Sequence, residues 1–308
     1  MSIHEIKTSS YDEWVQLRKK SIGGSDAGAI AGYNPYMAAH SLWAEKSGHV
    51  AGFEGNLTTE VGSYLEAFVA DLFTKETGKK VRRRNATVYN DDYPWAHANV
   101  DRVIVGENAL LEVKTTNSPP NLKLFRKGEY PPAWYCQVMH YMAVCGYRKA
   151  YIAVLIECRD FKVFEVDWDE EEAAELMDLE KRFWQHVQDG TPPPVSGLKC
   201  DSETLLAMHP ESVPGKIQLW GREHIFDELK LLGQQKKQLE QQEEALKQQI
   251  KLDLGDYDTG LCGPYKVTWK TQVRNTFDRK RFEKDNPGMN LAGYFNESKT
   301  RVFKVTEA

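Results

Sequence analysis

The chain has 308 residues, of which 41% are hydrophobic and 28% charged, as in an ordinary globular protein. This length suffices for one large domain or for a core domain with an appendage. The net charge of −5 argues against a protein that coats nucleic acid by bulk electrostatic attraction. No apolar run approaches the roughly 20 residues of a membrane span, and the N-terminus is polar, so we expect a cytoplasmic protein without membrane contact. The five cysteines form no CxxC pair, which predicts reduced thiols rather than disulfides or a zinc or iron–sulfur site.

Residues 1–192 alternate between helical and strand periodicity, which is typical of one α/β domain. The apolar residues of 57–77 recur at helical spacing until Gly78, which ends the helix. Gly106-Glu107-Asn108 is a predicted turn between two strands. In chain order we expect a helix at 57–77, strands at 80–89, 96–105 and 109–115, an amphipathic helix from 131 through 144, a β-hairpin of 151–156 and 161–166, and a helix at 170–188.

A linker is predicted at 193–213, because the run of prolines that ends at Pro194 is stiff and breaks helices. A second region, 214–308, follows it. Its first element is a helix at 223–252 whose middle is polar on nearly every face, which is typical of a projecting arm or a loose coiled coil. Strands are expected around 265–273 and 300–305, as a small β appendage. The sequence leaves the role of this region open.

Two carboxylates and one ammonium fall on neighbouring predicted strands. Asp101 lies on the second strand, and Glu112 and Lys114 lie on the third. Side chains alternate along a strand, so Glu112 and Lys114 point to one face, and the turn between the strands brings Asp101 to that face. Burying these charges among apolar neighbours is costly unless a partner such as a divalent metal compensates. Carboxylate oxygens favour Mg²⁺, for which Mn²⁺ can substitute.

The same three residues fit phosphodiester hydrolysis. Metal held by Asp101 and Glu112 can activate water and relieve charge on the leaving oxygen, and Lys114 can stabilise the developing charge or orient the water. An isolated Asp…Glu-x-Lys pattern is short and permissive, however, and is far more often an exposed hairpin with an ordinary Glu–Lys pair. Glu66 on the helix 57–77 is a candidate further ligand for metal or water. Gln137, on the helix that opens at 131, is either a contact to phosphate or water or a solvated side chain.

Five blocks in order carry a resemblance to a known family. They are RKKSIGGSD, GSYLEAFVADLF, NVDRV, LEVKTT and YCQVMHYMAVCG. In this order they resemble the YqaJ-type viral recombinases, relatives of the lambda phage exonuclease in the PD-(D/E)xK nuclease superfamily. The resemblance implies a restriction-endonuclease-like α/β core over residues 1–192, with a mixed central sheet flanked by helices. The second region, with its helical arm and β appendage, has no counterpart in it.

The resemblance also implies residue roles. Asp101, Glu112 and the Val113 carbonyl match metal ligands, Lys114 matches the catalytic lysine, and Glu66 matches a glutamate near the metals. Gln137 matches the glutamine of the helix that carries a glutamine in that family. Arg18 and Ser25 match residues that grip a 5′-phosphate, and donors of this kind beside glycines suit phosphate. Asn99 stands where the phage exonuclease has a serine that contacts the phosphate, so the geometry of the hydrogen-bond donor differs at this position. Val100 stands where the proline of the superfamily name would be.

The function that the resemblance implies is a 5′→3′ exonuclease on linear double-stranded DNA. It would generate 3′ single strands for phage-type homologous recombination, in the cytoplasm of a bacterial host. The implied partners are DNA ends, a single-strand annealing protein and further copies of the chain in a ring, commonly a trimer. Two alternatives stay open, an endonuclease of the same superfamily and a non-catalytic DNA-binding scaffold. The first would not need the block at Arg18 and Ser25, and the second would not need Asp101, Glu112 and Lys114.

Overall fold

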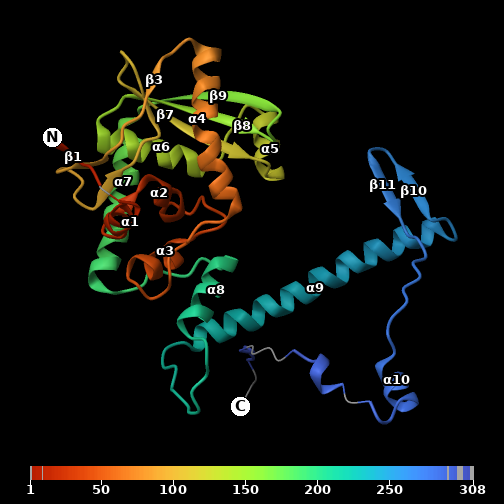
Figure 1. Cartoon of the computed structure of the whole chain (residues 1–308). Helices are drawn as coiled ribbons and strands as arrows, with labels where there is room; N and C mark the ends of the chain where they lie inside the picture. The colour runs from red at the N-terminus through yellow and green to blue at the C-terminus, as the bar shows by residue number, and fades with distance from the viewer. Residues whose placement is uncertain (1, 9, 290, 297–300, 306–308) are drawn as a thin grey trace. The chain divides into compact units, whose positions relative to one another are not determined.

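The computed structural model describes residues 2–8, 10–289, 291–296 and 301–305. The chain separates into two units, Met1–Pro210 and Glu211–Ala308 (Figure 1). Within the described residues, no helix is both long and apolar enough to cross a membrane.

A five-stranded mixed sheet forms the centre of the first unit (Figure 1). Its strands are β3 (Val81–Arg82), β6 (Arg102–Ile104), β7 (Ala109–Thr116), β8 (Lys149–Ile156) and β9 (Asp160–Asp167), in the order β3-β6-β7-β8-β9. β7 and β8 run parallel, and the other neighbours run antiparallel. β8 and β9 form the predicted hairpin, and β7 is the predicted strand that carries Glu112 and Lys114.

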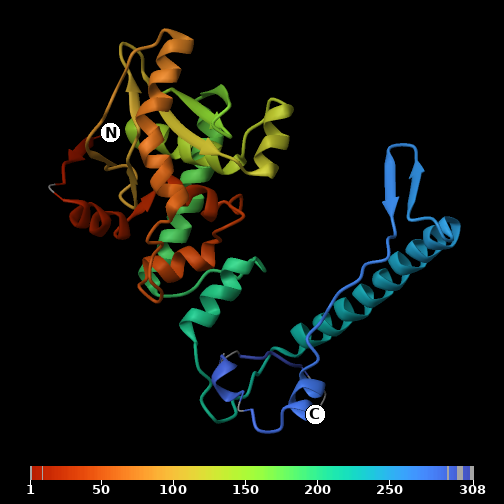
Figure 2. The same ribbon diagram turned by 45° about the vertical axis from the view of Figure 1, so that its right-hand side comes forward.

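Helices α4 (Leu57–Thr77) and α6 (Pro132–Cys145) cover opposite faces of this sheet (Figure 2). Neighbouring residues of β7 divide between them, since Leu111 joins the core cluster of α4 and Leu110 joins that of α6. α4 ends at Gly78, whose φ of 73° is the left-handed conformation of a helix C-cap. The prediction of an amphipathic helix was wrong for α6. Residues 136–145 are all buried, because helices α2 and α7 pack on the side away from the sheet.

A smaller four-stranded sheet lies beside the first and has the order β1-β4-β5-β2. Its strands are β1 (Ile3–Ile6), β2 (Ile22–Gly23), β4 (Thr87–Asn90) and β5 (Ala96–Ala98). The predicted strands 80–89 and 96–105 are therefore each split in two. β3 and β6 pair in the large sheet, whereas β4 and β5 pair in the small one, so the chain twice passes from one sheet to the other. Asp101 lies in the second of these crossings.

The remaining helices of the first unit complete its core. They are α1 (Tyr11–Lys19), α2 (Gly24–Ile30), α3 (Ala39–Lys46), α5 (Pro119–Arg126), α7 (Glu170–Asp189) and α8 (Lys199–Met208). The start of α2 lies so close to α6 that a Cβ at Gly24 would stand 2.4 Å from the Tyr141 ring. Only glycine fits this approach.

Helix α8 lies within the stretch 193–213 that was predicted to be a linker. Buried Asp201 accepts hydrogen bonds from Ser41 Oγ at 2.6 Å and from the Ser196 amide at 2.6 Å. The bond from Ser41 attaches α8 to α3, and the boundary between the units falls after Pro210. The first unit thus extends about one helix beyond the predicted boundary.

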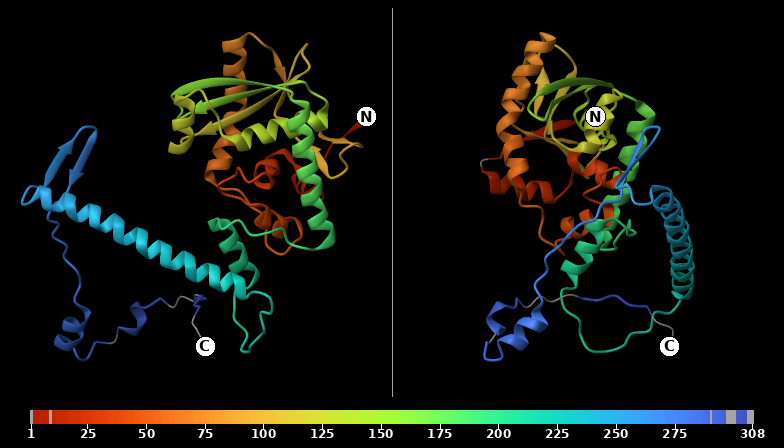
Figure 3. Two further views of the ribbon diagram at one scale, coloured as in Figure 1. Left: turned by 180° about the vertical axis from the view of Figure 1, so that it is seen from behind. Right: turned by 90° about the vertical axis from the view of Figure 1, so that its right-hand side faces the viewer.

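The second unit begins with the long helix α9 (Glu223–Leu254), close to the predicted 223–252. Strands β10 (Thr259–Cys262) and β11 (Tyr265–Thr268) form a hairpin at its C-terminal end (Figure 3). Helix α10 (Arg279–Asp285) and the short 3-10 helix η1 (Ala292–Tyr294) follow. The predicted strand around 265–273 ends at 268. At 300–305 the described part, 301–305, forms no strand, and Thr300 lies outside the described residues.

Candidate active site

Asp101 is held beside Glu112 by the pairing of β6 with β7. Arg102 stands opposite Leu111 in this antiparallel pair, so the residue before β6 stands next to Glu112. Asp101 Oδ2 accepts a hydrogen bond from the Val113 amide at 2.8 Å. The turn that connects the strands uses Gly106 at a φ of 84°, a left-handed conformation that favours glycine. The predicted juxtaposition of the two carboxylates on neighbouring strands is therefore present.

Glu112, Lys114 and Gln137 form a closed set of hydrogen bonds. Lys114 Nζ lies 2.7 Å from Glu112 Oε1 and 2.7 Å from Gln137 Oε1. Gln137 Nε2 in turn donates to Glu112 Oε1 at 2.7 Å and to the Tyr141 hydroxyl at 3.1 Å. Gln137 is therefore a buried bridge between β7 and α6 and not a solvated side chain.

The second oxygen of Glu112 is left without a protein partner. The Glu112 side chain is buried, and its Oε2 has no hydrogen-bond partner among the described residues. A buried anionic oxygen without a partner costs several kcal/mol in general, so it marks a place where a cation fits. Burial and the neighbouring Glu112 carboxylate also raise the pKa of Asp101 well above its usual range. A positive charge between the two carboxylates would pair with the free oxygen of Glu112 and would offset the repulsion that Asp101 experiences.

The donor set is nevertheless sparse. Among the described residues, no cluster of three or more His, Cys, Asp or Glu side chains has the geometry of a metal site. Asp101 and Glu112 supply two carboxylates, so the set suits an ion that keeps several waters, as Mg²⁺ does. Such an ion would complete its shell with water and backbone oxygen, for which the Val113 carbonyl is the predicted donor.

Glu66 differs from the prediction of a freely available ligand. It lines the same pocket as Asp101, but its carboxylate forms an ion pair with Arg102. Arg102 is buried and also donates to the Asp101 carbonyl oxygen at 2.7 Å. Arg102 was not among the site residues predicted from the sequence. An arginine among apolar strand residues signals a buried cation that needs a carboxylate, and this signal could have identified it.

Arg18 and Ser25 lie together, as predicted. Arg18 Nη2 donates to Ser25 Oγ at 3.1 Å, and its guanidinium lies over the Trp14 ring at 4.6 Å. Trp14 Nε1 reaches Asn99 Oδ1 at 3.4 Å, and Thr87 Oγ1 donates to the same oxygen at 2.8 Å. The side-chain oxygen of Asn99 is thus occupied by two protein donors. Its NH₂ group is a hydrogen-bond donor suited to phosphate.

A buried ion pair supports the segment that holds Arg18 and Ser25. Lys46 Nζ lies 2.7 Å from Asp26 Oδ2 and donates to the backbone oxygens of Arg18 and Ser21 at 2.9 and 3.0 Å. Asp26 Oδ2 also accepts from the Gly23 amide at 3.0 Å. Burial would raise the pKa of Asp26, but Lys46 and these hydrogen bonds hold it below its usual value. Asp26 is therefore a charged structural residue. Of the two neighbours, Ser25 is the candidate for binding phosphate.

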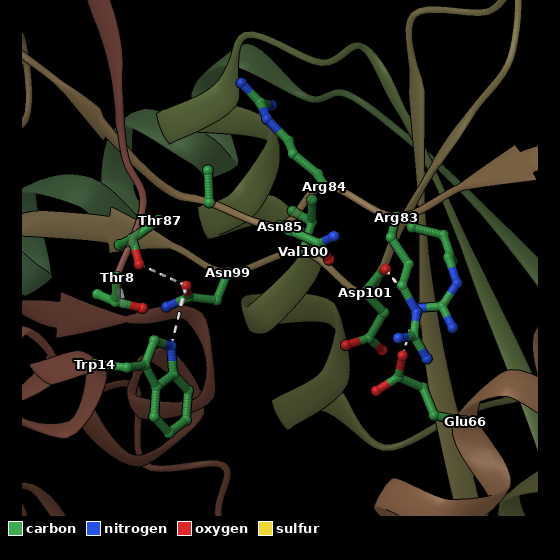
Figure 4. A pocket seen from close by; sticks show the side chains of 12 residues that line it. Thr8, Trp14, Glu66, Arg83, Arg84, Asn85, Thr87, Asn99, Val100 and Asp101 are labelled. Atoms are coloured by element: carbon green, nitrogen blue, oxygen red, sulfur yellow. Dashed lines mark hydrogen bonds and ion pairs between the residues drawn. The ribbon is translucent and has the colours of Figure 1, made fainter. Parts of the chain in front are cut away.

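A pocket of about 420 Å³ is lined by Asp101 of the first group of residues and by Trp14 and Asn99 of the second. Figure 4 shows Asp101 and Glu66 at one end of it and Trp14, Thr8 and Asn99 at the other. Arg83 and Arg84 also line it, but the Arg84 guanidinium donates to Glu5 and to the Tyr147 hydroxyl. A second pocket, of about 700 Å³, contains Arg18 and shares Trp14 with the first. The sequence analysis did not identify Trp14, which stands at the junction.

Behind the site lies a fully buried histidine–glutamate pair. His140 Nδ1 lies 2.9 Å from Glu180 Oε1, and neither side chain is exposed. His140 Nε2 lies 2.9 Å from the carbonyl oxygen of His97, so this nitrogen carries a proton. Burial would lower the pKa of His140, but the Glu180 carboxylate raises it above its usual value. The pair connects α6 and α7 to β5.

Comparisons with known proteins identify the family of the chain. Residues 13–148 match the family described as the YqaJ-like viral recombinase domain, and this range contains Asp101, Glu112, Lys114 and Gln137. The protein YqaJ of Bacillus subtilis (strain 168) is 39% identical over 285 residues, which are 90% of this chain and 89% of that protein.

The structure was also compared with solved structures. The alkaline exonuclease LHK-Exo of Laribacter hongkongensis, solved in complex with dAMP, has a TM-score of 0.50 at 16% identity, covering 58% of this chain and 93% of that chain. A further crystal structure of that enzyme gives a TM-score of 0.49 at 16% identity, with the same coverage. The likeness confirms the predicted PD-(D/E)xK fold for the first unit.

Proposed function

Because the chain belongs to the family of YqaJ-like viral recombinases, we propose that it is a metal-dependent exonuclease that degrades linear double-stranded DNA from 5′ ends. The observation that carries the proposal is the buried Oε2 of Glu112, which has no partner among the described residues, on a carboxylate whose other oxygen, Oε1, accepts from Lys114. The resemblance of the fold to an alkaline exonuclease supports the same chemistry.

Asp101 and Glu112 would hold the metal, with Mg²⁺ as the natural ion and Mn²⁺ as a substitute. When bound, such an ion lowers the pKa of water and neutralises charge on phosphate oxygens. The carboxylates fix the position of the ion because each is anchored, Asp101 by the Val113 amide and Glu112 by Gln137. Anchoring of this kind reduces the reorganisation needed during the reaction.

Lys114 would stabilise the negative charge that develops on the phosphate or orient the attacking water. Its ammonium is held by two acceptors, Glu112 and Gln137, and is partly exposed. Lysine has three donors, so one remains to face a phosphate. Gln137 keeps the lysine and the glutamate at a fixed separation and is a positioning residue for both.

The 5′ polarity would come from Arg18, Ser25 and the NH₂ of Asn99. A guanidinium, a hydroxyl and an amide are suited to a terminal phosphate, which carries more charge than an internal one. The product would be a 3′ single strand for an annealing partner. We also propose that copies of the chain assemble around DNA, as the family resemblance implies.

The proposal is tested by incubating the protein with a linear duplex and a covalently closed circle, in Mg²⁺ and in EDTA. We expect degradation of the linear DNA in Mg²⁺ alone, with the circle intact. Cutting of the circle would assign an endonuclease instead. Binding of DNA without cutting in Mg²⁺ would assign a scaffold.

The 5′ polarity is tested separately with Arg18→Ala. This variant should lose the preference for 5′-phosphorylated over 5′-hydroxyl ends, and the rate on phosphorylated ends should fall by about 10- to 100-fold, since a charge-assisted contact to phosphate is lost. Metal-dependent stabilisation of the variant serves as the control and should be unchanged. An undiminished preference for phosphate would remove Arg18 from the pocket.

A further inference from the structure

A stripe of side chains with heptad spacing runs along α9 and is open to solvent. Every residue of 223–250 is exposed, and the central leucines Leu239 and Leu246 are 65% and 61% exposed. The members of the stripe alternate at intervals of four and three residues. They are Ile225, Leu229, Leu232, Lys236, Leu239, Glu243, Leu246 and Ile250. We call them the α9 stripe.

The spacing of the α9 stripe points to a helical partner. A straight helix returns to the same side every 3.6 residues, whereas the stripe repeats every 3.5, the spacing that keeps a seam facing another helix in a coiled coil. A helix that only served as a spacer needs no such regularity. Six of the eight positions are large aliphatic residues, and these would be left in water if α9 stood alone.

We propose that the α9 stripe pairs with the α9 stripe of a second copy of this chain, in antiparallel orientation. The two charged members decide the orientation. A parallel pair in register would place Lys236 against Lys236 of the second copy and Glu243 against its counterpart. Like charges at core positions are unfavourable and are a common device against a wrong pairing.

An antiparallel pair matches the whole stripe with itself. When Ile225 stands level with Ile250 of the second copy, every member faces another member. The four distinct layers are Ile225 with Ile250, Leu229 with Leu246, Leu232 with Glu243, and Lys236 with Leu239, each formed twice by the symmetry of the pair. The ends of the seam are then purely apolar. The lysine of one chain lies one layer from the glutamate of the other, within reach of its long side chain. The two lysines also lie in adjacent layers, but each has the glutamate of the other chain on its opposite side.

The ion pairs present in the single chain do not oppose this arrangement. Lys236 lies 3.8 Å from Glu240, and Glu243 lies 2.5 Å from Lys247, both on the same helix. All four side chains are more than half exposed. Exposed pairs of this kind contribute little and are easily exchanged for contacts with the second copy.

Cysteine crosslinking of the full-length protein tests the pairing and its direction. The double variant Ile225→Cys with Ile250→Cys, made with the exposed Cys158 and Cys262 changed to serine, should form a covalent dimer on mild oxidation. Neither single variant should do so, because the two copies of position 225 would lie about 38 Å apart, 25 residues at roughly 1.5 Å each, far beyond disulfide reach. A crosslink from Ile225→Cys alone would mean a parallel pair and would overturn the proposal.

Gln234→Cys with Gln241→Cys is the matched control. These positions are level with each other in the antiparallel pair but lie on the side of α9 opposite the stripe. They should not crosslink. Equal crosslinking at these positions would reduce the result to random collision, and no dimer from any variant would mean that the stripe stays unpaired or packs elsewhere. Either result overturns the proposal.

Charge exchange in the double-cysteine background tests the register. Lys236→Glu alone and Glu243→Lys alone should each remove most of the covalent dimer, because each removes the opposite-charge contacts between adjacent layers and leaves only like charges there. The two substitutions together should restore it, since the lysine and the glutamate have only exchanged places. Failure of the combined variant to recover, or no loss in either single variant, contradicts the antiparallel register.

Discussion

Changing Glu112 to Gln separates the chemistry of the site from its stability. The amide keeps the shape of the side chain and the acceptor that Lys114 and Gln137 use at 2.7 Å. It removes one negative charge, which has two opposite consequences. The attraction to Lys114 is lost, but the repulsion that raises the pKa of Asp101 is lost too.

The magnitudes of these two effects nearly cancel. At the effective dielectric constant of a protein, the interaction of Glu112 with each of these two neighbours is on the order of 4 kcal/mol, with opposite sign for the two. We therefore expect the free energy of unfolding of the metal-free variant to lie within about 1 kcal/mol of the wild-type value. This corresponds to a shift in Tm of roughly 2–4 °C for a domain of this size. The rate of DNA degradation should fall by at least about 100-fold, the lower range for removing one group that stabilises a transition state.

Metal binding gives an independent readout. A Mg²⁺ concentration 100 times its Kd stabilises the wild type by about 2.7 kcal/mol, which raises Tm by roughly 5–10 °C. In Glu112→Gln most of this increase should disappear, while Glu165→Gln, an exposed acid paired with Lys149, should keep it. Differential scanning calorimetry and initial rates measure both effects. A wild-type rate in Glu112→Gln refutes the reasoning, and so does a metal-free Tm lowered by more than about 10 °C, which would make the loss structural.

Three further substitutions test supporting residues. Gln137→Leu should lower the initial rate by about 10- to 100-fold with a small change in Tm, since it removes the bridge that orients two catalytic side chains, and an unchanged rate would argue against positioning. Asp26→Asn should cost about 3 kcal/mol in chemical denaturation at pH 7, because it leaves Lys46 buried without its anion. The folded pKa of Asp26 is lowered, so this stabilisation is present above about pH 4 and lost as the pH falls through the folded pKa, and the gap between wild type and variant should close in acid. Glu180→Ala should cost about 3 kcal/mol and Glu180→Gln clearly less, because the amide can still donate to His140 Nδ1, and equal losses would contradict the pairing.

The centre of the site follows from local rules and was predictable. Strand alternation places Glu112 and Lys114 on one face, and the glycine turn at Gly106 returns Asp101 to them. The end of α4 at Gly78 and the start of α9 at Glu223 follow from equally local signals. These features depend on residues fewer than about fifteen positions apart.

What the sequence did not reveal depends on contacts between distant segments. The pairing of Glu66 with Arg102 joins residues 36 positions apart, so no periodicity signals it. The burial of both sides of α6 depends on α2 and α7 packing against it, and this made Gln137 look solvated from the sequence alone. Asp201 attaches α8 to Ser41 across 160 residues, which is why a polar stretch after prolines resembled a linker.

The split of two predicted strands has the same origin. Propensity favours extended chain throughout 80–89 and 96–105, but each segment contributes to two sheets. The crossing at residues 99–101 places Asn99 toward the small sheet and Asp101 toward the large one. The two ends of the pocket thus come from one crossing that the sequence pattern does not show.

The most direct test of the central proposal is the order in which label leaves a linear duplex with 5′-phosphorylated ends. Duplexes labelled at the 5′ or the 3′ terminus are digested in Mg²⁺ and sampled over time. The account predicts that 5′ label appears as mononucleotide at once, whereas 3′ label stays in long single strands. Immediate release of the 3′ label, with the 5′ label retained, would contradict it.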